Sequence, residues 1–199
     1  YKKKHIQPAK LKPSKDIDTK RILIEAEGDF ITRDLVNTPT NDMGPDALEK
    51  AFCDLAHKHN AKTNIIKGEA LLDQNFPMIH AVGRASDQQP RLLDMQWGEN
   101  NNPKITLVGK GVCFDTGGLN IKPTASMGLM KKDMGGSATV LGLAHMIMSL
   151  NLKVNLRVII PAVENSISSN SFCSFSTFAR FKSSLRTFCK RAKSRPLTK

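Results

Sequence analysis

Features of secreted and membrane proteins are absent from this 199-residue sequence. Its four cysteines form no CxxC pair and no zinc-finger spacing, which favours free thiols in a reducing compartment over a disulfide framework. No apolar run approaches the roughly 20 residues that span a bilayer. The opening letters YKKKH do not resemble a signal peptide. We therefore expect a cytoplasmic protein with no membrane partner.

Acidic residues are missing from the C-terminal end, where no Asp or Glu follows Glu164. Residues 166–199 hold eight Lys or Arg, nine Ser and five of the nine Phe, with no Gly. Residues 1–21 hold eight Lys or Arg against two Asp, a net charge of +6. The two ends thus carry +6 and +8 of the formal +12, which leaves −2 for residues 22–164. The basic charge belongs to the ends, and the body of the chain is near neutral.

Hydrophobic spacing predicts three helices. The first starts at Ile22, with apolar residues recurring on one face, and stops at the turn formers of residues 37–45. The second begins at Pro45, with acids in its first turn, where the helix dipole favours them. The third, residues 134–150, is apolar on nearly every side, so we expect other elements to cover it on several sides.

Short β-branched runs alternate with these helices and predict strands at residues 62–67, 78–82, 92–97, 105–108 and 156–162. This alternation predicts an α/β fold, a three-layer α/β/α arrangement around a mostly parallel, mixed sheet. The pattern stops after the last of these strands, so we expect the sheet to be incomplete at its C-terminal side. An uncovered parallel sheet exposes apolar faces and edges, which predicts poor solubility or partial folding.

Residues 108–136 place Lys110, Asp115, Lys122 and Asp133 among glycines. A hydrolytic site with two metal ions about 3.5–4 Å apart needs carboxylates of this kind. Lys110 can be a ligand only with its amine neutral, whereas a charged Lys122 can stabilise an oxyanion. By residue type alone, solvated loop charges and surface ion pairs remain the commoner explanation. The Gly-Lys-Gly at 109–111 lacks the spacing of a phosphate-binding loop.

The letters VGKGVCFDTGGLNIKP and MKKDMGGSATVLG resemble the catalytic domain of the leucyl aminopeptidase family, also called the cytosol aminopeptidase family. NTPTNDMGP, FPMIHAVGRAS and PAVEN resemble the same family in the same order, so the resemblance covers residues 21–165. It implies a hydrolase with two divalent cations, Zn²⁺ or Mn²⁺, that releases residues from peptides with a free N-terminus. Family members are usually homo-hexamers with a separate N-terminal domain.

The resemblance also implies roles for the four residues. Lys110, Asp115 and Asp133 would be metal ligands, with Asp115 bridging both cations, and Lys122 would be the catalytic lysine that polarises the substrate carbonyl. The metals would activate a bridging water. No histidine matches a ligand of the family motif. Cys113 is interpreted as a packing thiol, since no base is placed to activate it.

One part of the family pattern is missing after PAVEN. There the family continues into a segment close to NTDAEGR, which supplies two more metal carboxylates and an arginine, and this chain holds no such segment. The two-cation site is therefore incomplete. Loss of a group that hydrogen-bonds to a metal ligand typically lowers metal affinity by roughly 10- to 100-fold, and loss of two anionic ligands should lower it by more. We expect no aminopeptidase activity from this chain alone.

The sequence thus divides into three parts. Residues 1–20 are interpreted as a basic linker left from the boundary with a missing N-terminal domain, consistent with a start on Tyr1 instead of Met. Residues 21–165 are a partial metalloaminopeptidase catalytic domain. Residues 166–199 are a basic tail rich in Ser and Phe, interpreted as out-of-frame or disordered. Two alternative functions remain open: non-specific nucleic-acid binding through the tail, and a non-catalytic scaffold that joins intact family subunits.

Overall fold

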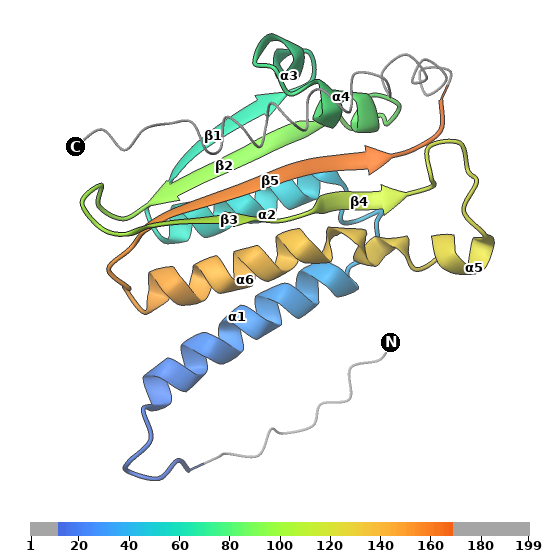
Figure 1. Ribbon diagram of the computed structural model, residues 1–199. Coiled ribbons are helices and arrows are strands. Elements are labelled where there is room, and N and C mark those ends of the chain that lie inside the picture. Colours follow the sequence, from blue (N-terminus) through green and yellow to red (C-terminus); the bar gives the residue numbers. More distant parts are fainter. Residues whose placement is uncertain (1–11, 169–199) are drawn as a thin grey trace.

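A five-stranded mixed sheet organises the described part of the chain, residues 12–168, in the computed structural model (Figure 1). The strand order is β1-β2-β5-β3, and β4 continues alongside β5 beyond β3. β1/β2 and β2/β5 are antiparallel, whereas β3 and β4 run parallel to β5. The sheet is mixed, as predicted, and its parallel part is formed by β3, β4 and β5. The bounds are β1 Lys62–Lys67, β2 Arg91–Trp97, β3 Lys104–Val108, β4 Gly111–Asp115 and β5 Asn155–Asn165.

Helices cover both faces of the sheet, as predicted (Figure 1). The long helices α2 (Pro45–Lys58) and α6 (Gly135–Ser149) pack on one face, with α1 (Thr19–Asn37) packed against α6, and the short helices α3 (Ala70–Asp73) and α4 (Pro77–Gly83) pack on the other. A short α5 (Thr124–Met127) and the 3-10 helix η1 (Met130–Met134) lead into α6. Within the described residues, no helix combines the length and apolarity needed to cross a membrane.

Alternation along the strands divides the core into a large and a small cluster. In β5, Leu156, Val158 and Ile160 are buried in the larger cluster on the side of α2 and α6, whereas Ile159 packs with α3 and α4. Successive side chains of a strand point to opposite faces, so one strand contributes to both clusters. The near-continuous hydrophobicity of this strand follows from its being covered on both faces.

Most predicted elements are present, with one error, and the short elements α3, α5, η1 and β4 were not predicted. The segment 78–82 is not a strand, because it belongs to α4, which begins at Pro77 and packs Ile79 on the smaller cluster. Residues 12–18 contain no helix or strand before α1 begins at Thr19. The remainder of the predicted linker and nearly all of the predicted tail, with its nucleic-acid alternative, lie outside the described residues.

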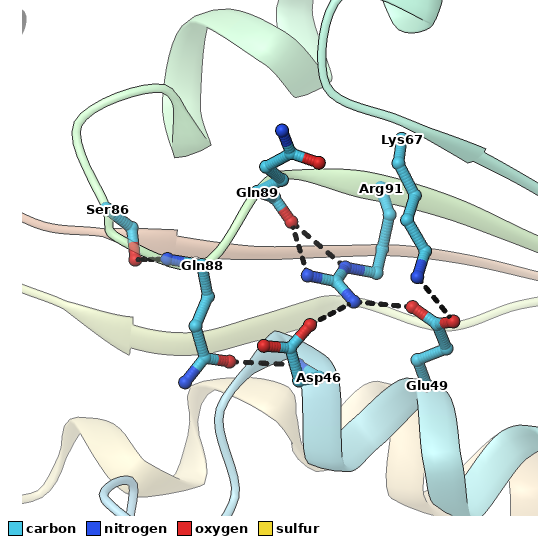
Figure 2. Close-up of polar contacts among 7 residues, drawn as sticks. All are labelled: Asp46, Glu49, Lys67, Ser86, Gln88, Gln89 and Arg91. Atoms are coloured by element: carbon cyan, nitrogen blue, oxygen red, sulfur yellow. Dashed lines mark hydrogen bonds and ion pairs between the residues drawn. The ribbon is translucent and has the colours of Figure 1, made fainter.

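A buried arginine ties α2 to the sheet (Figure 2). Arg91 of β2 has a side chain only 2% exposed and forms ion pairs with Asp46 and Glu49 in the first turns of α2. Its guanidinium also donates to the Gln89 carbonyl at 2.9 and 2.7 Å, and Lys67 of β1 reaches Glu49 at 2.7 Å. The two acids predicted to suit the helix dipole therefore also neutralise a buried cation. Nothing in the spacing of the sequence indicated that Arg91 would be buried.

Candidate metal centre

The structure brings the four predicted site residues together at the carboxyl end of β4. Lys110 lies between β3 and β4, and Asp115 is the last residue of β4. Lys122 lies in the following loop, and Asp133 lies in η1 just before α6. Lys110 Nζ is 2.8 Å from Asp133 Oδ1, and Lys122 Nζ is 2.8 Å from Asp115 Oδ2. The charge of Asp133 also helps to raise the pKa of Lys122, so the two ion pairs form one cluster.

A break between β3 and β4 places Lys110 outside the strands. β3 pairs with β5 up to Val108, and pairing resumes at Gly111 in β4. Pro161 of β5 lies in the interval between these two registers. A proline has no N–H to donate to a neighbouring strand, so it is tolerated where the ladder is already interrupted. Lys110 is thus free to leave the plane of the sheet.

Two glycines let this break approach the start of α6. A Cβ built on Gly109 would lie 2.7 Å from the Cα of Ser137, and one built on Gly136 would lie 2.8 Å from the backbone N of Lys110. Neither distance is possible for a real side chain. The backbone N–H of Ser137 donates to the Lys110 carbonyl at 2.9 Å. This close approach, which glycine permits because it has no side chain, brings Asp133 beside Lys110.

Several donors hold the carboxylate of Asp115. The chain turns at Gly117 and Gly118, whose φ angles of +83° and +86° suit glycine. Asp115 Oδ1 accepts hydrogen bonds from the Gly117 N–H at 2.9 Å and from Asn165 Nδ2 at 2.7 Å. Burial raises the pKa of Asp115, but these hydrogen bonds and the ammonium of Lys122 outweigh it and lower that pKa below its usual value. The Asp115 side chain is therefore an anion at neutral pH.

The carboxylate of Asp133 is held on one side only. Its Oδ1 binds Lys110, whereas its Oδ2 is buried and has no hydrogen-bond partner. A buried carboxylate oxygen without a donor is unfavourable in a folded protein, and a bound cation is one way to satisfy it. Asp133 thus has one oxygen free to bind a ligand.

Lys122 carries the positive charge that its predicted role requires. The hydrogen bond to Asp115 raises the pKa of Lys122, and the charges of Asp115 and Asp133 add to this effect against the smaller cost of desolvation. Its ammonium also lies 3.5 Å from Met130 Sδ. The residue is partly exposed, so the charge can face an incoming molecule.

The structure adds Asn165 to the residues predicted from sequence. Asn165 ends β5, and its carbonyl accepts from both the N–H and the hydroxyl of Thr116, at 3.0 and 2.9 Å. Its side chain at the same time orients Asp115. Glu164, the last acid of the chain, instead accepts hydrogen bonds from Ser86 and Ser166. Only the ending of PAVEN marked Asn165 in the sequence, and no spacing rule connected it to Asp115.

Among the described residues, no histidine contributes to this cluster. His145 is completely buried in α6, and its Nε2 contacts Glu27 of α1 at 3.1 Å while its Nδ1 contacts His59 at 3.1 Å. It follows the start of α6 by ten residues, or about 15 Å of helix. Across residues 12–168, no group of three or more His, Cys, Asp and Glu side chains is placed to hold a metal ion.

Comparison with known proteins assigns the family. Residues 30–175 match the cytosol aminopeptidase family, catalytic domain, a range that starts later and ends later than the predicted 21–165. A probable cytosol aminopeptidase of Corynebacterium glutamicum is 42% identical over 160 residues, which cover 78% of this chain and 32% of that protein.

Solved structures agree with this assignment. The crystal structure of the cytosol aminopeptidase from Coxiella burnetii is 52% identical, with a TM-score of 0.74 over 77% of this chain and 33% of that one. The bottromycin maturation enzyme BotP, in complex with Mn, is 34% identical, with a TM-score of 0.68 over 73% of this chain and 32% of that one. The chain thus spans about a third of the length of the relatives it matches. It belongs to the cytosol aminopeptidase family, of whose metallopeptidase catalytic domain it carries a part.

Proposed function

We propose that this chain carries one part of the metal centre of an aminopeptidase and does not hydrolyse peptides by itself. The observation that carries the proposal is the cluster at the end of β4. There Asp115 and Asp133 lie with two lysines, and one buried oxygen of Asp133 has no partner. Carboxylates are suitable ligands for Zn²⁺ and Mn²⁺. The BotP relative in complex with Mn supports a divalent cation.

The fit to a metal is partial. Asp115 and Asp133, with the Lys110 amine in its neutral form, would hold a divalent cation. A cation in such a site lowers the pKa of a bound water and so supplies a nucleophile for a peptide carbonyl. Each carboxylate is already paired with an ammonium group, and the described residues offer no third acidic, His or Cys ligand beside them. The cluster is therefore too small to hold two cations.

The remaining roles follow from the same cluster and from the family. Lys122, held charged by its pairing with Asp115, would stabilise negative charge that develops on the carbonyl oxygen of the substrate. The substrate would be a peptide with a free N-terminus. A cytoplasmic location is supported by the cytosol aminopeptidases among the relatives. A homo-hexamer is implied by the family resemblance and is best tested by light scattering on the purified chain.

Metal titration and an activity assay on the purified chain test the proposal together. With Zn²⁺ or Mn²⁺ added, we expect binding of no more than one equivalent by calorimetry and no hydrolysis of leucine-p-nitroanilide above background. Asp133→Asn should abolish that binding, because it removes the anion whose oxygen is free. Asp29→Asn, at an exposed carboxylate of α1, is the matched control and should bind as the unaltered chain does. Robust hydrolysis or two tightly bound equivalents would refute the proposal, and equal binding by Asp133→Asn would remove Asp133 from the site.

A further inference from the structure

β4 holds one more residue than the stretch of β5 that pairs with it. Val112 faces Val163 and Phe114 faces Glu164, so Cys113 between them is an extra residue in the register. An extra residue of this kind is a β-bulge, which bends its strand and redirects the side chains that follow. Bulges are common at sheet edges and next to active sites. This bulge lies in the strand that leads directly into the candidate metal centre.

The bulge determines which residue of β5 lies opposite Asp115. Asp115 faces Asn165, whose Nδ2 donates to Asp115 Oδ1 at 2.7 Å. In a ladder without the extra residue, Phe114 would face Asn165 and Asp115 would lie one position beyond it. A shift of one residue turns every side chain of a strand to the other face of the sheet. The Asp115 carboxylate would then point away from the cluster.

Two contacts hold the bulge in place. Cys113 is only 1% exposed, and its side chain packs in the larger core cluster. Its carbonyl accepts a hydrogen bond from Thr40 Oγ1 at 3.1 Å, across 73 positions of sequence. The ladder is disrupted at a bulge, and a buried carbonyl there needs a donor from another part of the chain. The Thr40 hydroxyl is that donor.

Thr40 is itself held in a tight turn. The segment that joins α1 to α2 contains it and passes beside β4 (Figure 1). In this turn the Pro39 carbonyl accepts hydrogen bonds from the backbone N–H groups of Asp42 and Met43, at 2.9 Å each. The Met43 side chain packs against the larger core cluster. The hydroxyl therefore comes from a segment with its own internal bonds and its own place in the core.

The same segment also contacts η1. Lys131 Nζ donates to the Asn37 carbonyl at 3.2 Å, and Lys131 lies two residues before Asp133. The α1–α2 segment thus bonds to both parts of the chain that carry a carboxylate of the candidate metal centre. Of these two bonds, the one from Thr40 is partly buried and the one from Lys131 is exposed. Since water competes less for a buried bond, the bond from Thr40 is the stronger constraint.

We propose that Thr40 is a positioning residue of the candidate metal centre, because its hydroxyl holds the bulge at Cys113 and so keeps the Asp115 carboxylate in the cluster. Removing the hydroxyl would leave the Cys113 carbonyl without its donor, and the bulge would open more often. Asp115 would then spend more time away from its hydrogen-bonded position. The inference deepens the proposed function, and only its metal-binding part rests on that function.

Thr40→Val tests the inference without metal, since it removes the hydroxyl and keeps a branched side chain of similar size. Hydrogen exchange followed by NMR on the full chain reports on the carboxylate through the Gly117 N–H, which donates to Asp115 Oδ1 at 2.9 Å. We expect this N–H to exchange about tenfold faster in the variant, because a buried carbonyl without a donor destabilises the closed bulge. The N–H of Leu93, a fully buried residue of β2, reports global unfolding and should change less.

Metal binding is the second measurement. By calorimetry with Zn²⁺, Thr40→Val should bind about tenfold more weakly than the unaltered chain, whereas Thr40→Ser, which keeps the hydroxyl, should match the unaltered chain in both measurements. Thr32→Val is the matched control, because it removes a hydroxyl that joins α1 to the Ala138 carbonyl of α6 at 3.3 Å. It should leave the exchange of Gly117 and the Zn²⁺ affinity unchanged. Melting curves verify that each variant folds, and Thr40→Ala replaces Thr40→Val if the latter does not fold.

Four results would overturn the inference. They are equal exchange of Gly117 in Thr40→Val and the unaltered chain, the same acceleration in Thr32→Val, the same acceleration in Thr40→Ser, and an unchanged Zn²⁺ affinity in Thr40→Val. If the unaltered chain binds no Zn²⁺ but Gly117 responds to Thr40→Val as expected, the proposed function is refuted and the inference stands.

Discussion

Replacing Arg91 with methionine should destabilise the fold more than any exposed charge substitution. The methionine keeps much of the apolar length of the arginine stem, so the main loss is the guanidinium and its ion pairs. Glu49, whose side chain is 17% exposed, would lose one of its two cationic partners, and the Gln89 carbonyl would lose both donors. Removing one partner of a buried ion pair costs about 3–5 kcal/mol.

The expected cost lies at the lower end of that range. Glu49 keeps its contact with Lys67 at 2.7 Å, and Asp46 is 66% exposed, so its pairing contributes no more than a surface ion pair does, about 0–1 kcal/mol. We therefore expect Arg91→Met to lower the free energy of unfolding by about 3 kcal/mol. With a urea m-value of about 2 kcal/mol/M, the midpoint of unfolding moves down by about 1.5 M.

Urea denaturation followed by circular dichroism at pH 7 measures this difference. The control is Arg21→Met, which removes an exposed ion pair with Glu25 on α1 and should leave the midpoint of unfolding nearly unchanged. The double variant Glu49→Gln/Arg91→Met should be less destabilised than the sum of the single variants, because it leaves no unpaired carboxylate. If Arg91→Met and Arg21→Met have equal midpoints, the cluster in Figure 2 does not stabilise the fold as described.

Three further predictions concern a histidine, a glycine and a cysteine. Burial lowers the pKa of His59, and the charges of His145 and Lys58 lower it further. The unfolded chain therefore binds this proton more tightly than the folded chain does. The contribution of His59 to stability is present above about pH 6.5 and is lost as the pH falls below that value. The melting temperature should fall from pH 7.5 to 5.5 and fall less in His59→Asn; an equal fall in both proteins would exclude this role. Gly109→Ala should lower the free energy of unfolding by about 1–3 kcal/mol, because its Cβ would clash with the Ser137 backbone. Gly128→Ala, whose Cβ would have its nearest neighbour at 3.6 Å, should leave the free energy of unfolding nearly unchanged in the same denaturation assay. Burial raises the pKa of Cys113 to about 12, so peptide mapping should find it unmodified by iodoacetamide at pH 8 until urea unfolds the chain; rapid labelling without urea would contradict its buried position.

The sequence predicted the parts of the fold that local patterns determine. The three predicted long helices and the strands at 62–67 and 156–162 are present. The segment 78–82 was misassigned because a five-residue apolar run fits a strand and a buried helical turn equally well. Length did not help, since α4 is only seven residues long.

Sequence patterns did not predict the polar contacts between residues far apart in the chain. Arginine is normally exposed, so nothing in the region of Arg91 indicated burial against acids 42 or more positions earlier in the chain. The family motif identified Lys110, Asp115, Lys122 and Asp133 as a set, but it did not indicate which lysine faces which carboxylate. The hydrogen bond from Asn165 to Asp115 joins residues 50 positions apart, and only the pairing of β4 with β5 brings them together.

Pro161 has a consequence for how the sheet assembles. If β5 were shifted by one position against β3 and β4, Pro161 would face a strand residue whose carbonyl needs an N–H donor, which proline lacks. The same shift would turn each apolar side chain of β5 to the opposite face of the sheet. Both penalties act against the same misalignment. A residue that weakens the ladder locally therefore selects a single alignment of the central strand during folding, and that alignment sets Asp115 beside Asn165.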